Sequence, residues 1–233
     1  DLAGNPYAGG DTWSYTLDSV APDVASTVPA DGASVNALGT VSVTFDEAVQ
    51  NVDLADLEVN GSAVATGLTG SGAGPYVWTI PAQSDGTINL VLNAGTPATT
   101  DLVGNLYTGP EAWSVDLDTV DPTIDTLVPA DGAVVTSLTT VSVTFDESVS
   151  NVAMADLLVN GSATATGLSG TGAGPYAFTI PQPADGAVNL ELTAGTPATA
   201  DAAGNPFAGA SWSYDLDATA PAILGQSRLL PHH

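Results

Sequence analysis

The chain has 233 residues, 44% of them hydrophobic, with no cysteine and a formal net charge of −25 at pH 7. Its 26 acidic residues face a single basic residue, Arg228. Binding to nucleic acid or to an anionic lipid surface requires Lys or Arg, so the charge argues against both partner classes. The missing cysteines exclude disulfides and thiolate metal sites, and no apolar run is long enough to insert into a membrane. Cations are the partners that this charge favours.

The sequence repeats with a period of 100 residues. Residues 1–100 align with residues 101–200 without a gap, and more than half of the positions are identical. A third copy begins at Asp201 and ends near Asp217. Arrays of one module are typical of proteins with a mechanical or spacing role. The predicted organisation is a partial repeat over 1–18, complete modules over 19–118 and 119–217, and a tail over 218–233 that resembles vector-encoded sequence.

Each repeat shows the period-two alternation of half-buried β-strands. Turn signals separate the runs, among them the Asn60-Gly61 pair that is typical of tight hairpins. We therefore expect an all-β chain of tandem immunoglobulin-like β-sandwiches with about seven strands each. Trp13, Trp113 and Trp212 recur at equivalent places in the last strand and are expected to fill the cores. In the first repeat the alternation is clearest over residues 41–45, 76–80, 88–92 and 113–117.

Four motifs recur in the same order in both repeats. In the first they are Val-Pro-Ala-Asp-Gly at 28–32, Val-Ser-Val-Thr-Phe-Asp-Glu at 41–47, Asp-Leu-Val-Gly-Asn at 101–105 and Trp-Ser at 113–114. This order resembles the bacterial Ig-like domains of S-layer proteins and large repetitive surface adhesins, and residues 117–122 are similar to their linkers. The resemblance implies an extracellular or cell-surface stalk segment whose partners are the adjacent modules of the same chain, with calcium at the module junctions.

The topology of such a sandwich brings three acidic segments together at the end where the linker enters, which we call the entry pole. Like charges at contact distance are unfavourable without compensation. Calcium accepts six to eight oxygen ligands in flexible geometry, whereas zinc prefers the His and Cys that the repeats lack. A Ca²⁺ site is therefore expected at each pole. Its candidate ligands are Asp18, Asp46, Glu47 and Asp101 in the first module, and Asp118, Asp121, Asp146, Glu147 and Asp201 in the second.

The same acids have a simpler interpretation. Asp46 and Glu47 could be solvated loop residues, and Asp101 with Asn105 could shape a turn through hydrogen bonds between side chain and backbone. Both modules keep these acids, whereas other acids vary, as Asp53 does against Ala153. This difference favours a shared role for the acids of the entry pole.

The expected function is a structural extender of a surface adhesin, stiffened by calcium and without enzymatic activity. Paired carboxylates can serve glycoside hydrolysis, but catalysis is not normally repeated in tandem, and neither a Ser/His/Asp nor a Cys/His set occurs. A first alternative is a glycan-binding accessory module that uses Tyr7, Tyr107 and Phe207. These aromatic residues could equally form a hydrophobic lid over the end of the sandwich.

A second alternative is a self-assembling surface-layer or filament subunit. Residues 1–17 match the last loop and strand of a repeat, yet both complete modules already have such strands at 111–117 and 211–217. The first segment therefore lacks a module of its own. It reflects where the chain was cut, or it pairs with the exposed sheet edge of another molecule by homotypic strand addition.

Overall fold

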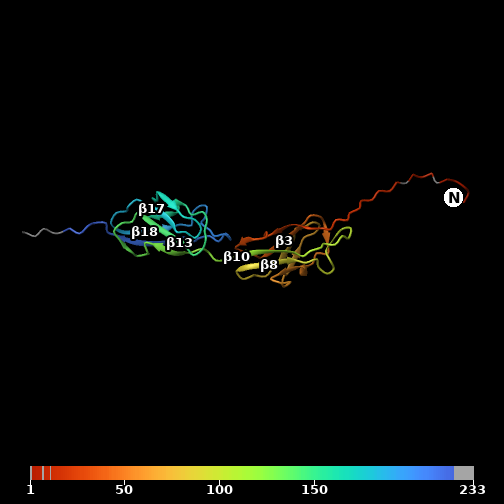
Figure 1. The fold of residues 1–233 in the computed structure, drawn as a ribbon, viewed down its shortest axis with the longest axis horizontal. Helices are drawn as coiled ribbons and strands as arrows, with labels where there is room; N and C mark the ends of the chain where they lie inside the picture. Colours follow the sequence, from red (N-terminus) through yellow and green to blue (C-terminus); the bar gives the residue numbers. More distant parts are fainter. Residues whose placement is uncertain (1, 7, 11, 223–233) are drawn as a thin grey trace, which may run out of the picture. The chain divides into compact units, whose positions relative to one another are not determined.

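The computed structural model describes residues 2–6, 8–10 and 12–222. Two compact units are present, one formed by the residues up to Gly32 with 38–83 and 88–115, the other by 33–37, 84–87 and the residues from Asp116 onward. Each sheet contains strands of one repeat only (Figure 1). Within the described residues, helix is limited to two 3₁₀ turns, η1 (Leu54–Asp56) and η2 (Met154–Asp156).

The first repeat folds into two four-stranded sheets and one short strand pair. The first sheet has the order β1-β3-β7-β6, and its neighbours are antiparallel. The second sheet has the order β2-β10-β8-β5, and β4 pairs with β9. The strands are β1 (Val24–Val28), β2 (Ala33–Val35), β3 (Thr40–Phe45), β4 (Val49–Gln50), β5 (Leu57–Val59), β6 (Gly67–Thr69), β7 (Tyr76–Thr79), β8 (Gly86–Leu92), β9 (Thr100–Asp101) and β10 (Glu111–Leu117).

The second repeat has the same plan. One sheet has the order β11-β13-β17-β16, and the other has the order β12-β19-β18-β14-β15. In the second sheet β12 runs parallel to β19, whereas β18 is antiparallel to it. The strands are β11 (Ile124–Val128), β12 (Val134–Val135), β13 (Thr140–Phe145), β14 (Leu157–Val159), β15 (Ser162–Ala163), β16 (Gly167–Ser169), β17 (Tyr176–Thr179), β18 (Gly186–Leu192) and β19 (Ala210–Leu216).

These strand orders are those of tandem immunoglobulin-like β-sandwiches. An immunoglobulin sandwich places its first, second, fourth and fifth strands in one sheet and the remaining strands in the other. Here the chain changes sheets at the turn over residues 29–32, so the first strand is divided between both sheets as β1 and β2. The prediction of an all-β immunoglobulin-like fold is therefore confirmed. The strands outnumber the seven expected per repeat, because short segments such as β4 and β9 also pair.

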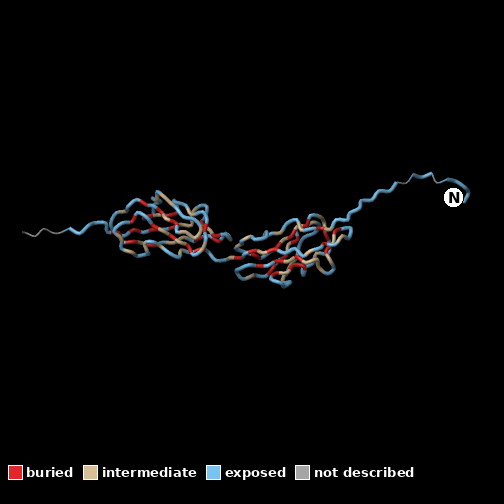
Figure 2. The backbone as a smooth tube through the Cα atoms, in the orientation of Figure 1, coloured by how far each residue is buried: buried red, intermediate tan, exposed pale blue. Residues whose placement is uncertain are grey.

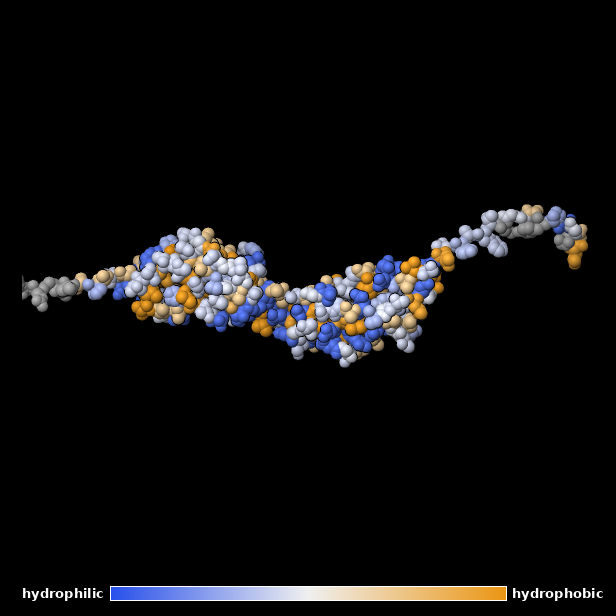
Figure 3. Space-filling model, in the orientation of Figure 1, coloured by the Kyte–Doolittle hydropathy of each residue, from blue (hydrophilic) through white to orange (hydrophobic). Residues whose placement is uncertain are grey.

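The cores follow the period-two patterns of the sequence. In β3, Val41, Val43 and Phe45 are buried, whereas the residues between them are less buried. Figure 2 shows that the buried segments lie in the interior of each unit. Trp113 and Trp212 are buried as expected, but Trp13 is 90% exposed, so its expected place in a core is wrong for this structure. On the face shown in Figure 3, apolar side chains are scattered among polar ones.

Candidate metal centre

Three carboxylates converge at the entry pole of the second unit. Asp118 precedes β11, Glu147 follows β13, and Asp201 lies in the loop between β18 and β19. One oxygen from each of them lies within 4.8 Å of the other two. The equivalent residues of the first unit, Asp18, Glu47 and Asp101, satisfy the same distance. We call these sets the second-unit trio and the first-unit trio.

The neighbouring acids Asp46 and Asp146 are outside the trios and bind backbone instead. Oδ1 of Asp46 accepts a hydrogen bond of 2.8 Å from the N–H of Asp23. Asp146 accepts one of 2.8 Å from the N–H of Thr123 and one of 2.6 Å from its hydroxyl, and these bonds lower the pKa of the Asp146 carboxyl. Both residues therefore fix the chain that enters the module. Asp121 is exposed and also lies outside the trios.

The loop after β9 holds Asp101 in a fixed orientation. Its Oδ1 accepts hydrogen bonds from the N–H groups of Val103, Gly104 and Asn105 at 2.9, 2.6 and 2.8 Å. Gly104 has a φ of 103°, a conformation that residues with a Cβ rarely adopt. Burial raises the pKa of the Asp101 carboxyl, but the hydrogen bonds from Asn105 and the backbone outweigh it, and the net shift is downward. Oδ2 accepts a hydrogen bond from Asn105 and keeps lone-pair capacity for a further partner.

Asn205 connects this loop to the linker in the second unit. Its Nδ2 donates to Oδ2 of Asp201 at 2.7 Å and to the backbone carbonyl of Asp118 at 2.8 Å. Asn205 is buried, and Asn105 makes the same two contacts in the first unit, although its bond to the carbonyl of Asp18 is longer at 3.3 Å. The turn-forming role considered for Asp101 and Asn105 is thus present alongside the clustering. Sequence reasoning did not assign the Asn side chain to the linker, although its recurrence four residues after the Asp was a signal.

The electrostatics of both poles are unfavourable for charged Glu side chains. Loss of surrounding water, and then the charges of Asp201, Asp118 and Asp146, raise the pKa of Glu147. The pKa of Glu47 is raised in the same way, by lost hydration and then by Asp18, Asp101 and Asp46. The described residues contain no Lys or Arg that could compensate, because Arg228 lies outside them.

The geometry and chemistry of each trio fit a hard divalent cation. Oxygens on opposite sides of a calcium ion are separated by at most about 4.8 Å, twice a bond length of about 2.4 Å. The trio oxygens lie within 4.8 Å of one another, so each pair of them meets this limit for sharing one ion. All three donors are carboxylates, which suits Ca²⁺ better than Zn²⁺. Water molecules would complete the six to eight ligands that calcium takes.

The aromatic residues of the same loops are packed inside the sandwiches. Tyr107 and Phe207 are buried, and their rings contact Phe45 and Phe145 edge to face, with centroid distances of 5.6 and 5.2 Å. Both form the hydrophobic lid considered above and offer no stacking surface to a sugar ring. Tyr7 lies outside the described residues.

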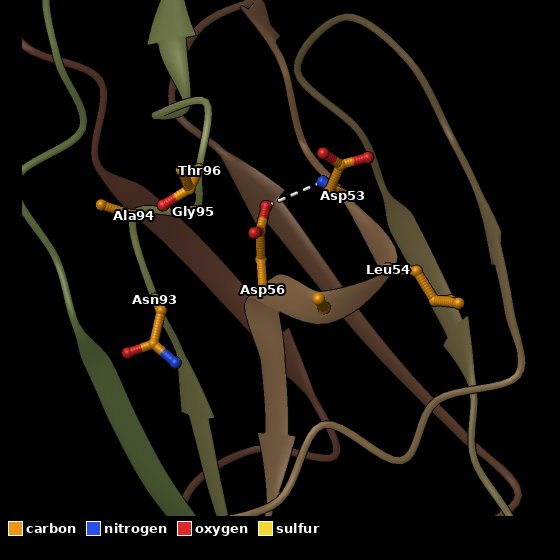
Figure 4. A pocket seen from close by; sticks show the side chains of 8 residues that line it. Asp53, Leu54, Asp56, Asn93, Ala94, Gly95 and Thr96 are labelled. Atoms are coloured by element: carbon orange, nitrogen blue, oxygen red, sulfur yellow. Dashed lines mark hydrogen bonds between the residues drawn. The ribbon is translucent and has the colours of Figure 1, made fainter.

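A hollow of about 600 Å³ beside η1 is lined by Asp53, Asp56 and Gly95, among others (Figure 4). Oδ2 of Asp56 accepts a hydrogen bond of 2.7 Å from the N–H of Asp53. Burial raises the pKa of Asp56, and the charge of Asp53 adds to this effect. Gly95 has a φ of 78°, and a Cβ there would lie 2.5 Å from Oδ1 of Asp56, so both the backbone conformation and the packing favour glycine. Asp56 thus supports the turn, and the hollow lacks a third carboxylate.

No protein-family profile and no curated protein sequence matches the chain. Among solved structures, immunoglobulin domains 1–4 of Sidekick-1 are similar to it at 11% identity and a TM-score of 0.39, with 88% of this chain and 51% of that chain covered. The titin domains Z1Z2 in complex with telethonin are similar at 14% identity and a TM-score of 0.26, covering 86% and 97%. The chain thus spans about half the length of the Sidekick-1 structure. None of the helices in the described residues is long and apolar enough to cross a membrane.

Proposed function

We propose that this chain is a structural extender segment of a bacterial cell-surface adhesin, and that each trio binds Ca²⁺. The observation that carries the calcium proposal is the convergence of Asp118, Glu147 and Asp201 within 4.8 Å, without a basic side chain among the described residues. The first-unit trio repeats this arrangement. A calcium site at the same position in both units suits a role that every module of an array performs.

Calcium at the second-unit trio would act on the linker. Asp118 belongs to the linker, whereas Glu147 and Asp201 belong to the loops of the module that follows. One ion bound to all three would add to the hydrogen bond from Asn205 to the carbonyl of Asp118. The linker would then be fixed to the module, so that pulling force passes along the chain with little change in angle. We assign no catalytic role to the trios, because both repeats carry the same acids without an accompanying nucleophile and base.

Calorimetry and isothermal titration test the proposal. A ligand that binds only the folded state stabilises it by about 2.7 kcal/mol at 100 times its Kd. For a domain of this size, that corresponds to a melting temperature raised by on the order of 10 °C. Calcium is expected to raise the melting temperature of the intact chain, and EDTA to reverse the change.

Glu147→Gln is expected to remove the effect of calcium on the second unit. Glu191→Gln is the matched control, because Glu191 is an exposed acid of the same unit outside the trio. If calcium binds neither trio in the titration, or if EDTA leaves both melting transitions unchanged, the calcium proposal is wrong. The extender role would then rest on the repeats alone.

A further inference from the structure

Residues 12–17 carry an apolar face that no described residue covers. Trp13, Tyr15 and Leu17 alternate with small or polar residues and are 90%, 89% and 81% exposed. Three large side chains in strand alternation, all exposed, are unusual in an isolated segment of a soluble protein.

The two complete repeats show what covers the same face when a module is whole. Trp113, Val115 and Leu117 of β10 are 5%, 1% and 4% exposed. In β19 the equivalent residues are buried to a similar degree. They are Trp212, Tyr214 and Leu216, at 6%, 2% and 2%.

The pairing partners of this strand are equally well defined. In the second unit, Trp212 lies opposite Leu190 and Tyr214 lies opposite Val188 on β18. On its other side, β19 pairs in parallel with β12, where Leu216 lies opposite Val135. The strand is therefore internal to its sheet, between two neighbours, and the same holds for β10 between β2 and β8.

An internal position determines which partner residues 12–17 can take. A segment that adds to a sheet edge pairs on one side only, whereas β10 and β19 pair on both sides. Trp13, Tyr15 and Leu17 match residues that are at most 6% exposed at this internal position, so the place that they match is internal and not an edge. In both complete modules the internal place is already occupied by β10 or β19.

We propose that residues 12–17 are the last strand of a further β-sandwich, completed by a segment that has the sequence pattern of this repeat and lacks its own last strand. Trp13 would lie opposite the equivalent of Leu190, and Tyr15 opposite the equivalent of Val188. This proposal does not depend on calcium. It differs from edge pairing between copies, because it needs a partner with a vacant internal position.

The test places residues 119–200 directly before residue 1 of the full chain. Ala200 is then followed by Asp1, as it is followed by Asp201 in the second repeat. The added segment contains no tryptophan, so the chain keeps its four. The signal of Trp13 is obtained by subtracting the spectrum of the Trp13→Phe variant in each background.

The expected result is a blue shift of Trp13 emission, with a several-fold drop in its quenching by acrylamide. The amides of residues 12–17 should also gain hydrogen-exchange protection comparable to that of residues 112–117. Trp13→Asp in the extended chain should abolish this protection without changing the melting of the two original units.

Two results would overturn the proposal. The first is continued exposure of Trp13 in both of two extended chains. One carries residues 119–200 before residue 1, and the other carries residues 19–100 there instead. The second is concentration-dependent association of the original chain that Trp13→Asp abolishes, since this would show that residues 12–17 pair with complete modules.

Discussion

The effect of Glu147→Gln on stability is expected to change sign when calcium is removed. Without a cation, Glu147 is repelled by Asp118 and Asp201, whose oxygens lie within 4.8 Å of its own. Charges at that separation repel by about 1 kcal/mol in water and about 3 to 4 kcal/mol at an effective dielectric constant near 20. Glu147 is only partly buried, so the lower figure applies to each pair. The variant should therefore stabilise the second unit by about 1 to 2 kcal/mol in EDTA.

In calcium the order reverses. At 100 times the Kd, the original chain gains about 2.7 kcal/mol, which the variant loses together with its ligand. The variant is then less stable than the original chain by about 1 kcal/mol. Calorimetry in EDTA and in calcium measures both differences, at about 4 to 8 °C per kcal/mol for a domain of this size.

The pH dependence gives an independent check on the same residue. The pKa of Glu147 is raised in the folded state, so its contribution to stability is present below its unfolded pKa and is lost as pH rises through the folded value. In EDTA, the gap between the Gln variant and the original chain should close as pH falls below the raised pKa. A variant that is less stable than the original chain in EDTA at pH 7 would refute the reasoning, because it would mean that the trio is compensated without a cation.

Asn205→Ala should destabilise the second unit by about 2 kcal/mol in calorimetry, with or without calcium, because Oδ2 of Asp201 and the carbonyl of Asp118 both lose the hydrogen bond from the Asn205 side chain. Tyr107→Phe should change the melting temperature of the first unit little, because Phe207 fills the matched position of the second unit with the same edge-to-face contact. A decrease in the free energy of unfolding above about 1 kcal/mol would contradict this, because it would reveal a hydrogen bond to the Tyr107 hydroxyl. Asp146→Asn should destabilise at pH 7 in urea unfolding. Because the pKa of Asp146 is lowered in the folded state, this loss should shrink as pH falls through the folded-state pKa, and a loss that does not change with pH would contradict this.

The choice between adjacent acids shows where sequence reasoning reached its limit at the site. Asp146 and Glu147 were both candidates, and the structure brings only Glu147 into the trio. Asp146 instead accepts hydrogen bonds from Thr123, a residue 23 positions earlier. The direction of each side chain depends on the path of β11 beside β13, and no local pattern records that path.

The sequence by itself determined the repeat, the strands and the internal faces, because strand alternation is a local property carried by neighbouring residues such as Val41 and Val43. It also identified three acidic segments that meet at one pole. Tertiary structure alone decided which carboxylates converge and that Asn205 binds the carbonyl of Asp118, 87 positions away. It also decided that Trp13 is exposed although its counterparts are buried. The physical reason is that burial and ligand geometry depend on which distant segment lies opposite a residue, whereas strand formation depends mainly on its own neighbours.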